Sequence, residues 1–460
     1  MPLRRSYRVH FVGIGGIGMS GIAEVLLNLG YTVSGSDLSE GETSIRLRQL
    51  GATVFKGHHR ENLKDVDAVV ISSAVRADNP EVVAARDKNI PVIPRAEMLA
   101  ELMRMKHGIA VAGSHGKTTT TSIMASVLAE AGLDPTMVIG GRLNSLGSNA
   151  KLGQGEFLVA EADESDGSFL KLSPTFAIIT NIDPEHLDHF GTLPLIQDAF
   201  VEFANKVPFY GLVVVCLDHQ NVQAILPRIT KRVATYGFTA QADYRAANIA
   251  YGRSDVQFDV IRRGQELGRV RLRMIGKHNV LNGLAVVAMA DELQVPFQFV
   301  QKAFEKFQGI QRRFTIRGEA GGVTVVDDYG HHPEEIKTTL DGAKRAWERR
   351  LVVVFQPHRY TRTRDQGVEF HKAFNQADLV VVMDIYAAGE DPIEGVHSRN
   401  ITEGIRSLGH RNVHYLPTRE QVVTWLQQET RAGDLLVTMG AGDVWKVGEE
   451  FLKGQTRRQP

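Results

Sequence analysis

The 460-residue chain has one cysteine, no surplus of either charge and no long apolar run. Cys216 alone can form no internal disulfide, and its apolar neighbours in the sequence predict a buried core residue. Lys plus Arg and Asp plus Glu both number 53, which disfavours a general nucleic-acid binder. No apolar run reaches the about 18 residues that span a bilayer, and no signal-cleavage site follows the N-terminus. We therefore expect a cytoplasmic protein that binds no nucleic acid and enters no membrane.

The stretch Ile109–Gly132 predicts a strand, a glycine-rich loop and a helix. The loop glycines let backbone N–H groups face a phosphate, and the helix N-terminus adds positive potential. Lys117 is expected to reach the β- and γ-phosphates of ATP, and Thr118 to ligate Mg²⁺. Val111 stands where the longer G-x-x-x-x-G-K-[ST] pattern has its first glycine, and a plain helix-capping turn is the alternative. We favour ATP binding, with candidate loop residues Gly113, Ser114, His115, Gly116, Lys117, Thr118 and Thr119.

A second glycine motif stands near the N-terminus, between a strand over Tyr7–Val12 and a helix ending near Leu29. Gly13–Gly18 matches G-x-G-x-x-G, and Asp37 ends the next strand where a ribose-binding acid is expected. The motif suits the pyrophosphate of NAD and that of a nucleotide sugar equally well. Serines follow the next strand, and a polar loop spans 140–149, although both also fit ordinary turns. The candidate ligands here are Gly15, Gly16, Ile17, Gly18, Asp37, Ser72, Ser73 and Asn144.

Acidic residues follow two strands of the central region. The strand Glu156–Ala160 runs into an acidic segment over 161–166, and the strand Thr175–Thr180 is followed by His186. Carboxylate and imidazole at neighbouring strand ends suit a divalent cation that bridges phosphates. The alternatives are a solvated acidic turn and a structural histidine. We predict that Thr118, Glu161 and His186 hold Mg²⁺.

The remaining chain continues as an α/β pattern. Short alternating strands over 213–275 predict an antiparallel flank on the central sheet. Asn279 and Asn282 share one face at the start of the next helix, where they read a base edge or cap the helix. In the C-terminal third, polar residues follow the strand Val323–Val326, and three arginines follow Leu351–Phe355. Arginines at a strand end suit a carboxylate or a phosphate, the alternative being a basic helix start.

Eight motifs together resemble one family, the Mur ligases, over nearly the whole chain. They are GIGGIGMSG (13–21), GSHGKTTT (113–120), EADESDGSF (161–169), NIDPEHLD (181–188), GKHNVLN (276–282), DDYGHHPEE (327–335), FQPHRYTRT (355–363) and GAGD (440–443). The chain is most similar to the alanine-adding branch. The resemblance implies three α/β domains: a Rossmann-like UDP-substrate domain (1–106), a P-loop ATPase-type domain with a mixed sheet (107–310) and a Rossmann-like amino-acid domain (311–460).

The resemblance also implies a reaction and its residues. The lactyl carboxylate of UDP-N-acetylmuramate takes the γ-phosphoryl group of ATP, and L-alanine attacks the acyl phosphate. The chemistry fits, because a carboxylate accepts an amine only after its oxygen becomes a good leaving group. By resemblance, the cofactors are ATP and Mg²⁺, and we expect a monomer or a weak homodimer. The implied roles are Lys117, Glu161, His186, His358 and Arg359 in catalysis; Asn279 and Asn282 at adenine; Arg313 at the ATP phosphates; Asp328 and Tyr329 at the nucleotide; and Arg359, Arg362 and Tyr329 at the amino acid.

One position departs from the family. Several members carry a carbamylated lysine after the metal histidine, where Val201 falls here, and no lysine lies between His186 and Lys206. The alanine-adding branch resembles this arrangement, so the remaining ligands of a second metal stay open.

Three rival functions fit parts of the sequence. An NAD-dependent oxidoreductase fits the N-terminal glycine motif but leaves the loop 113–118 without a role. A recycling ligase that adds a whole peptide to the same sugar needs a roomier C-terminal site. A non-catalytic regulator binds ATP without turnover.

Overall fold

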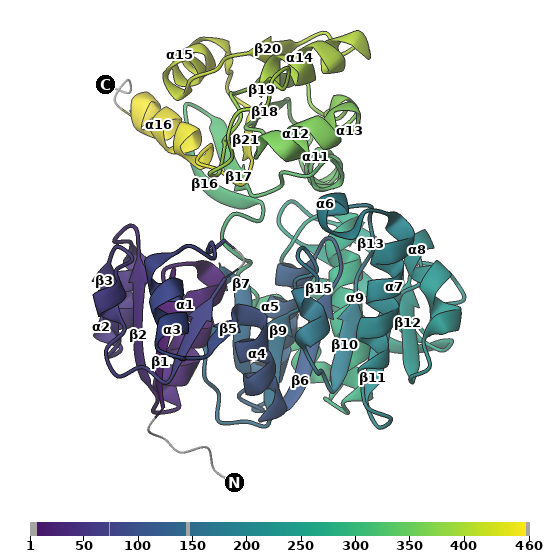
Figure 1. Ribbon diagram of the computed structural model, residues 1–460. Coiled ribbons are helices and arrows are strands. Elements are labelled where there is room, and N and C mark those ends of the chain that lie inside the picture. The colour runs from purple at the N-terminus through teal and green to yellow at the C-terminus, as the bar shows by residue number, and fades with distance from the viewer. Residues whose placement is uncertain (1–6, 73, 144–147, 457–460) are drawn as a thin grey trace. The chain divides into compact units, whose positions relative to one another are not determined.

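The computed structural model describes residues 7–72, 74–143 and 148–456. The chain forms two compact units. The first comprises Met1–Ile249, Phe258–Leu272 and Val280–Gln308; the second comprises Ala250–Gln257, Arg273–Asn279 and Gly309–Pro460. Within the described residues, the first unit carries a five-stranded sheet and nearly all of a ten-stranded sheet, and the second carries a six-stranded sheet (Figure 1).

The N-terminal sheet is parallel, in the order β3-β2-β1-β4-β5. Its strand order reverses beside β1, so the glycine loop after β1 lies at the switch point where α/β sheets bind ligands. The strands are β1 (Arg8–Val12), β2 (Thr32–Asp37), β3 (Thr53–Lys56), β4 (Ala68–Ile71) and β5 (Val92–Pro94). The helices are α1 (Ile17–Asn28), α2 (Glu42–Gln49), η1 (Arg60–Asn62), α3 (Pro80–Asp87) and α4 (Arg95–Arg104).

A buried carboxylate lies at the centre of this sheet's polar packing. Glu81 of α3 is fully buried and accepts hydrogen bonds from Ser36 Oγ at 2.5 Å and Asn62 Nδ2 at 2.6 Å. The imidazoles of His10 and His58 lie 3.5 and 3.4 Å from its oxygens. Burial opposes ionisation, but the hydrogen bonds of His10, Ser36 and Asn62 lower the pKa of Glu81 below its ordinary value of 4.5.

Replacing Glu81 by glutamine is expected to destabilise this sheet by about 2–3 kcal/mol, because a buried network loses its charged acceptor. A lowered pKa stabilises the fold fully above pH 4.5, and that stabilisation is lost as the pH falls through the folded-state pKa. The gap between wild type and variant should therefore shrink below pH 4.5 in urea unfolding. The exposed Glu61→Gln is the control, and an equal loss there would contradict the assignment.

The central sheet runs β15-β14-β13-β12-β11-β10-β6-β9-β7-β8. Its strands are β6 (His107–Ala112), β7 (Thr136–Leu143), β8 (Ser148–Lys151), β9 (Phe157–Glu161), β10 (Phe176–Ile179), β11 (Leu212–Cys216), β12 (Val233–Gly237), β13 (Tyr244–Tyr251), β14 (Val256–Arg262) and β15 (Gln265–Leu272). Its helices are α5 (Lys117–Glu130), η2 (Ser168–Lys171), α6 (Leu187–Phe190), α7 (Leu193–Asn205), α8 (Gln220–Ile225), η3 (Leu226–Arg228), α9 (Lys277–Glu292) and α10 (Phe297–Lys306).

The predicted antiparallel flank begins later than the sequence pattern indicated. β11 pairs with β12, and β12 with β13, in parallel. Both faces of β11 are buried, and α8 supplies the crossover that a parallel pair needs. β14 and β15 are joined through Arg263 and Gly264, whose positive φ angles of 47° and 85° fit a type I′ hairpin. Cys216 of β11 is buried, as expected.

The sheet of the second unit runs β16-β17-β21-β18-β19-β20 and is parallel except between β16 and β17. A Cβ on Gly342 of α11 would lie 3.0 Å from Gly276 Cα, so this helix approaches residue 276 backbone to backbone. The strands are β16 (Thr315–Ala320), β17 (Val323–Asp328), β18 (Leu351–Phe355), β19 (Leu379–Val382), β20 (Val413–Tyr415) and β21 (Leu435–Met439). The helices are α11 (Pro333–Ala346), α12 (Tyr360–Asp365), α13 (Gly367–His371), α14 (Ser398–Ser407), α15 (Arg419–Glu429) and α16 (Trp445–Thr456).

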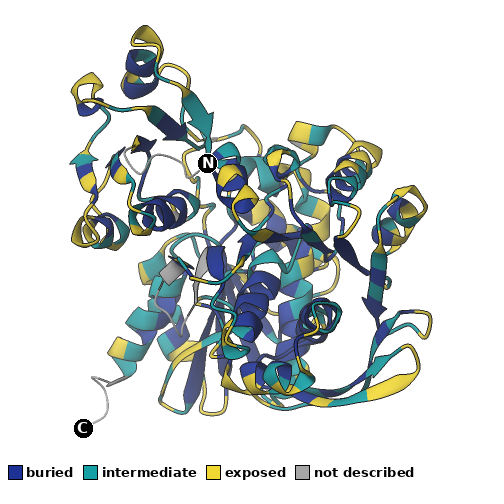
Figure 2. Cartoon of the chain, turned by 90° about the horizontal axis from the view of Figure 1, so that it is seen from below, coloured by how far each residue is buried: buried dark blue, intermediate teal, exposed yellow. Residues whose placement is uncertain are grey.

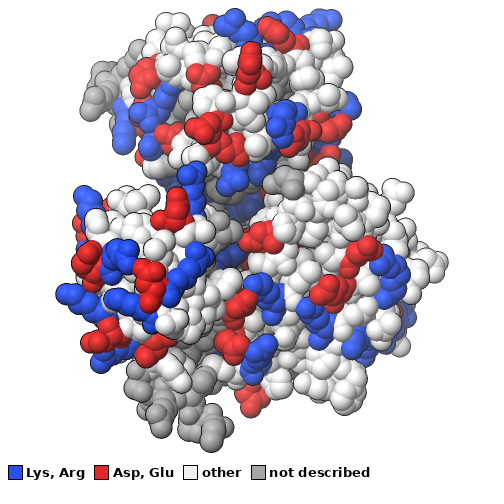
Figure 3. Space-filling view, viewed as in Figure 1, with Lys and Arg blue, Asp and Glu red and all other residues white. Residues whose placement is uncertain are grey.

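Burial and charge follow this layering. The strands of the sheets are dark with buried residues, and exposed residues gather on outer helix faces and loops (Figure 2). On the face shown in Figure 3, Lys and Arg alternate with Asp and Glu without a large patch of one sign. Among the described helices, none combines the length and the apolar character needed to cross a membrane.

Candidate functional site

The predicted phosphate loop, residues 113–118, follows β6 and leads into α5, so the expected strand, loop and helix are present. Gly113 and Gly116 have φ angles of 134° and 82°, which favour glycine. A Cβ on Gly113 would overlap Thr180 Oγ1, so the loop lies directly against the end of β10. The amide of His115 donates to Asn181 Oδ1 at 2.7 Å, and the hydroxyl of Thr180 donates to the His115 carbonyl at 2.6 Å. The loop is therefore held by the neighbouring strand end.

Lys117 is the first residue of α5 and lies within this loop. Its ammonium donates to the carbonyls of Gly113 at 2.7 Å and Ser114 at 3.3 Å, and to Glu164 Oε1 at 2.8 Å. Burial disfavours the charged form, but the carboxylates of Glu164 and Asp163 outweigh it and raise the pKa of Lys117. Burial likewise raises the pKa of Glu164, although Lys117 opposes it. Lys117 is thus a fixed positive charge at the loop.

The three predicted metal ligands lie around the same loop. Thr118 Oγ1 donates to Glu161 Oε2 at 3.1 Å, which brings a hydroxyl and a carboxylate side by side. His186 caps α6 in the left-handed region, with Nε2 3.9 Å from Glu164 Oε1. Within the described residues, no group of three or more His, Cys, Asp and Glu is arranged to hold a metal. A hydroxyl and a carboxylate beside a phosphate loop nevertheless fit Mg²⁺, which keeps waters and takes phosphate oxygens as ligands.

A histidine–aspartate chain supports the loop from the β10 side. His115 Nε2 lies 3.3 Å from Asp183 Oδ2 and 3.2 Å from Glu185 Oε1, and His219 Nε2 lies 3.3 Å from Asp183 Oδ1. Burial opposes ionisation, but the two imidazoles lower the pKa of Asp183. The amide of Asp183 also donates to Ser114 Oγ at 2.8 Å. Asp183 therefore holds the side chains of Ser114 and His115, the two loop residues between Gly113 and Gly116.

The two asparagines of α9 have different surroundings. A Cβ on Gly116 would lie 2.5 Å from Asn282 Oδ1, so Asn282 covers the phosphate-loop turn. Asn279 donates to the carbonyl of Ile275, four residues earlier, at 2.7 Å, whereas a helix-capping side chain would accept a backbone N–H. Thr119 is buried in the first turns of α5.

In the N-terminal glycine loop, the acid that the motif predicts, Asp37, contacts the loop itself. Asp37 Oδ2 accepts a hydrogen bond from the amide of Gly15 at 2.9 Å, and a Cβ on Gly15 would lie 2.8 Å from that oxygen. Gly16 is the N-cap of α1, which begins at Ile17 and includes Gly18. Ser72 directly follows β4, the neighbour of β1. Ser73 and Asn144 lie outside the described residues.

In the second unit, the buried Asp328 and the half-buried Arg313 lie near Tyr329, and Arg313 Nη1 pairs with Glu335 Oε1 at 3.2 Å. Asp328 accepts the amides of Phe314 and Gly330, both at 2.8 Å. Burial raises the pKa of Asp328 to about 6, although Arg313 opposes this. Burial disfavours the charge of Arg313, but Glu335 and Asp328 outweigh it and raise its pKa. The Arg313 guanidinium lies 5.6 Å from the centre of the Tyr329 ring.

The segment after β18 places its histidine and arginines together. Arg362 Nη1 donates to the carbonyl of His358 and to its Nδ1, both at 3.1 Å. Burial and the guanidinium groups of Arg362 and Arg359 lower the pKa of His358 to about 4, so the ring is neutral at pH 7. Since arginine only donates, Nδ1 accepts, and the proton of the neutral ring is on Nε2. Arg359 has a φ of 71°, and its amide donates to the Tyr386 carbonyl at 2.9 Å.

Sequence reasoning missed several residues that shape these loops. The sequence pattern gives no separate role to Glu164, which is one of the acids of the segment 161–166, or to Thr180, Asn181 and Asp183. The signal that identifies them is the sheet order, because β9 and β10 flank β6 and their ends therefore meet the phosphate loop.

Known proteins resemble the chain along its whole length. Family models described as "Mur ligase family, catalytic domain", "Mur ligase middle domain" and "Mur ligase, glutamate ligase domain" match residues 8–107, 111–290 and 312–442. The UDP-N-acetylmuramate–L-alanine ligase of Anaeromyxobacter dehalogenans (strain 2CP-C) is 60% identical over 97% of this chain and 98% of its own. The enzyme of the same name from Geobacter sulfurreducens is 59% identical, covering 97% of each chain.

Solved structures agree with these relatives. The UDP-N-acetylmuramate–alanine ligase of Thermotoga maritima has a TM-score of 0.84 and 32% identity, covering 98% of this chain and 100% of its own. A murein peptide ligase from Psychrobacter arcticus has a TM-score of 0.73 and 26% identity, covering 98% of each chain. The predicted α/β fold class with three such domains is confirmed.

Proposed function

The chain belongs to the Mur ligase family, and on that premise we propose how its residues divide the reaction. The enzyme is an ATP-dependent ligase that joins L-alanine to the lactyl carboxylate of UDP-N-acetylmuramate in peptidoglycan precursor synthesis. The carboxylate oxygen attacks the γ-phosphorus and ADP leaves. The amine nitrogen then attacks the acyl carbon, inorganic phosphate leaves, and the amine loses a proton. We place the reaction in the cytoplasm, where ATP and nucleotide sugars are found.

The observation that carries the ATP assignment is the environment of Lys117. A largely buried ammonium lies within the glycine loop, where it donates to the carbonyls of Gly113 and Ser114 and, at 2.8 Å, to Glu164 Oε1. Phosphoryl transfer needs a fixed positive charge at the β- and γ-phosphates, because negative charge spreads over the transferring group. Lys117 supplies that charge, and the N-terminus of α5 adds partial positive potential beside it.

Thr118, Glu161 and His186 are our candidates to hold Mg²⁺. When bound, the ion neutralises phosphate charge and so favours attack by the carboxylate. The protein's part is to keep the Thr118 hydroxyl and the Glu161 carboxylate adjacent, as their 3.1 Å hydrogen bond supports.

The second unit supplies our candidates for the amino acid. Arg362 and Arg359 are the proposed partners of the alanine carboxylate, and the neutral His358 offers an Nε2–H donor to a phosphoryl oxygen. Tyr329 lies beside Arg313, whose fixed charge suits the ATP phosphates. Asp328 accepts the amides of Phe314 and Gly330, the residues that follow Arg313 and Tyr329 in the chain.

The N-terminal glycine loop is our candidate for the UDP diphosphate. Asp37 accepts the amide of Gly15 and so helps to hold this loop against the end of β2. The relatives that are 59–60% identical are named alanine ligases, which favours a single amino acid over the whole peptide of a recycling ligase.

Release of phosphate from ATP, measured with UDP-N-acetylmuramate and each amino acid in turn, tests the function. Turnover is expected with L-alanine. Turnover only with a peptide would identify a recycling ligase, and ATP binding without any turnover would identify a regulator. Tight binding of NADH with no response to UDP-N-acetylmuramate would overturn the ligase function altogether.

Glu161→Gln and His186→Ala are expected to raise the Mg²⁺ concentration needed for half-maximal turnover by roughly 10-fold or more, because each removes a ligand. Excess Mg²⁺ should restore part of the activity. Glu156→Gln, just before the same strand, is the control. Normal Mg²⁺ dependence in both variants would exclude these ligand roles.

A further inference from the structure

Arg95 is the first residue of α4, and it lies between two loops of the first unit. A Cβ on Gly18 would lie 2.7 Å from Arg95 Nη1, so the guanidinium is against the first turn of α1. Its other terminal nitrogen, Nη2, lies 3.4 Å from Asp163 Oδ2. Gly18 is the last glycine of the motif after β1 and lies in the first turn of α1, and Asp163 belongs to the acidic segment after β9. One side chain therefore contacts both the motif that we assign to the UDP diphosphate and the acidic segment beside the proposed ATP loop.

The side of Arg95 that faces α1 is electrostatically unusual. The N-terminus of a helix carries partial positive charge and normally attracts acidic residues. The first turn of α1 contains no acidic residue, and its N-cap Gly16 has no side chain to cap it. Instead the guanidinium of Arg95 lies there, and three-quarters of the Arg95 side chain is buried. Two like charges in one place are stabilised by an anion between them, and oxygens of a diphosphate have this chemistry.

On its other side, the Arg95 guanidinium contacts Asp163, which lies in the acidic segment beside the proposed ATP loop. Asp163 precedes Glu164 in the chain, and Glu164 accepts a hydrogen bond from Lys117. Oδ1 of Asp163 accepts a hydrogen bond from the amide of Ser165 at 3.2 Å. In the described chain, Asp163 is the only protein acceptor that the Arg95 guanidinium contacts. Burial opposes ionisation of Asp163, but Lys117, Ser165 and Arg95 outweigh it and lower the pKa of this carboxyl. Arg95 thus contacts the segment that carries Glu161 and Glu164, through Asp163.

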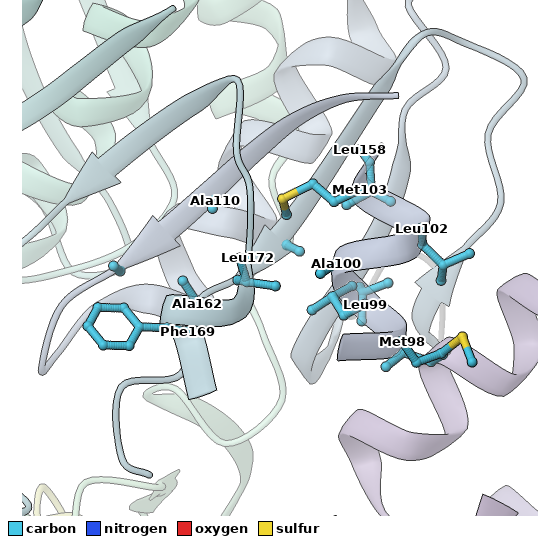
Figure 4. Packing of buried hydrophobic residues seen from close by; sticks show 14 of the residues in the cluster. Met98, Leu99, Ala100, Leu102, Met103, Ala110, Leu158, Ala162, Phe169 and Leu172 are labelled. Atoms are coloured by element: carbon cyan, nitrogen blue, oxygen red, sulfur yellow. The ribbon is translucent and has the colours of Figure 1, made fainter. Parts of the chain in front are cut away.

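Helix α4 is well anchored to that segment, so the position of Arg95 is defined. Met98, Leu99 and Leu102 of α4 lie in one apolar cluster with Ala162, Phe169 and Leu172, as Figure 4 shows. Glu97 of α4 also pairs with Lys171 of η2. A rigid helix on the segment 161–172 holds the guanidinium where both loops meet it.

We propose that Arg95 is a positioning residue shared by the two phosphate sites: Nη1 and its neighbours hold the diphosphate of UDP-N-acetylmuramate, while Nη2 holds Asp163 and with it the acidic segment of the ATP site. This inference rests on the proposed function. The planar fork of arginine can serve two anions at once, whereas lysine offers a single point charge.

The test compares Arg95→Met, Arg95→Lys and Asp163→Asn with Arg104→Met, a variant at the exposed end of the same helix. Binding of UDP-N-acetylmuramate is measured by calorimetry, turnover by phosphate release, and folding by the unfolding temperature. Arg95→Met should weaken UDP-N-acetylmuramate binding by roughly 10- to 100-fold and lower kcat, with the KM for ATP within about threefold. Arg104→Met should match wild type.

The other variants separate positioning from a structural role. Arg95→Lys should restore most of the substrate affinity but not kcat, because its single ammonium cannot hold both anions. Asp163→Asn should lower kcat while leaving UDP-N-acetylmuramate affinity unchanged, and adding it to Arg95→Met should lower kcat no further. If Arg95→Met fails to fold, the lysine and asparagine variants decide through the same two readouts.

Several results would overturn the inference. They are wild-type UDP-N-acetylmuramate affinity in Arg95→Met, full kcat in Arg95→Lys, or kcat losses of Arg95→Met and Asp163→Asn that multiply in the double variant. Each of these leaves the function intact as long as wild type ligates L-alanine. Absence of that ligation in wild type would instead reject the proposed function.

Discussion

Replacing Lys117 by alanine is expected to lower kcat by about 10³-fold or more, with the affinity for UDP-N-acetylmuramate within about threefold of wild type. The reason is that Lys117 is the buried positive charge of the ATP loop, whereas the UDP diphosphate is assigned to the separate loop after β1. Phosphate release and calorimetric binding measure the two effects independently.

Two further variants make this result specific. Lys306→Ala removes a lysine from the same unit whose partner is Glu130, and it should retain full activity. Lys117→Arg keeps the charge but not the compact ammonium held by the Gly113 and Ser114 carbonyls, so it should recover only a small part of kcat. Equal losses of UDP-N-acetylmuramate affinity and turnover in folded Lys117→Ala would contradict two separate phosphate sites.

Replacing Arg362 by alanine is expected to raise the KM for L-alanine by roughly 10- to 100-fold, and the KM for ATP by less than about threefold. Arg362 is oriented by its hydrogen bonds to His358, so its guanidinium can meet a carboxylate in a defined direction. Arg359 has a positive φ of 71° and lowers the pKa of the same imidazole, and its alanine variant should affect both substrates.

Changing the amino-acid substrate gives a second test of Arg362 as the partner of the alanine carboxylate. Alaninamide lacks the carboxylate and should not react, while glycine and serine should be poor substrates, because a small apolar wall discriminates by only about 1–3 kcal/mol per methylene. Arg364→Ala is the matched control, since that exposed arginine of the same helix pairs with Asp365. An unchanged L-alanine KM in Arg362→Ala, or good turnover of alaninamide, would remove Arg362 from the carboxylate site.

The phosphate loop could be predicted because its signals are local. An apolar strand, glycines at positive φ and a helix start all lie within residues 107–130, and the structure has each of them. The partners of the loop are not local. Glu164 and Asn181 meet it only because β9 and β10 both pair with β6, and nothing in a single sequence gives that order.

Two other expectations show the same limit. Spacing located Asp37 at the end of β2, but its contact with the Gly15 amide depends on how the glycine loop folds back onto β2. Alternating apolar residues indicated the strands after Val213, but alternation carries no information about strand direction. Direction is fixed by the connection, and the α8 crossover makes β11 and β12 parallel.

The backbone contact between Gly342 and Gly276 limits how the chain can be divided. The second unit is not one continuous stretch, because it includes Ala250–Gln257 and Arg273–Asn279 as well as Gly309–Pro460. A recombinant fragment beginning at Gly309 would lack residue 276, and the close-packed side of α11 would be open to solvent at Gly342. During synthesis, the second unit can fold completely only after α11 has been made, because its segments Ala250–Gln257 and Arg273–Asn279 are made before α11.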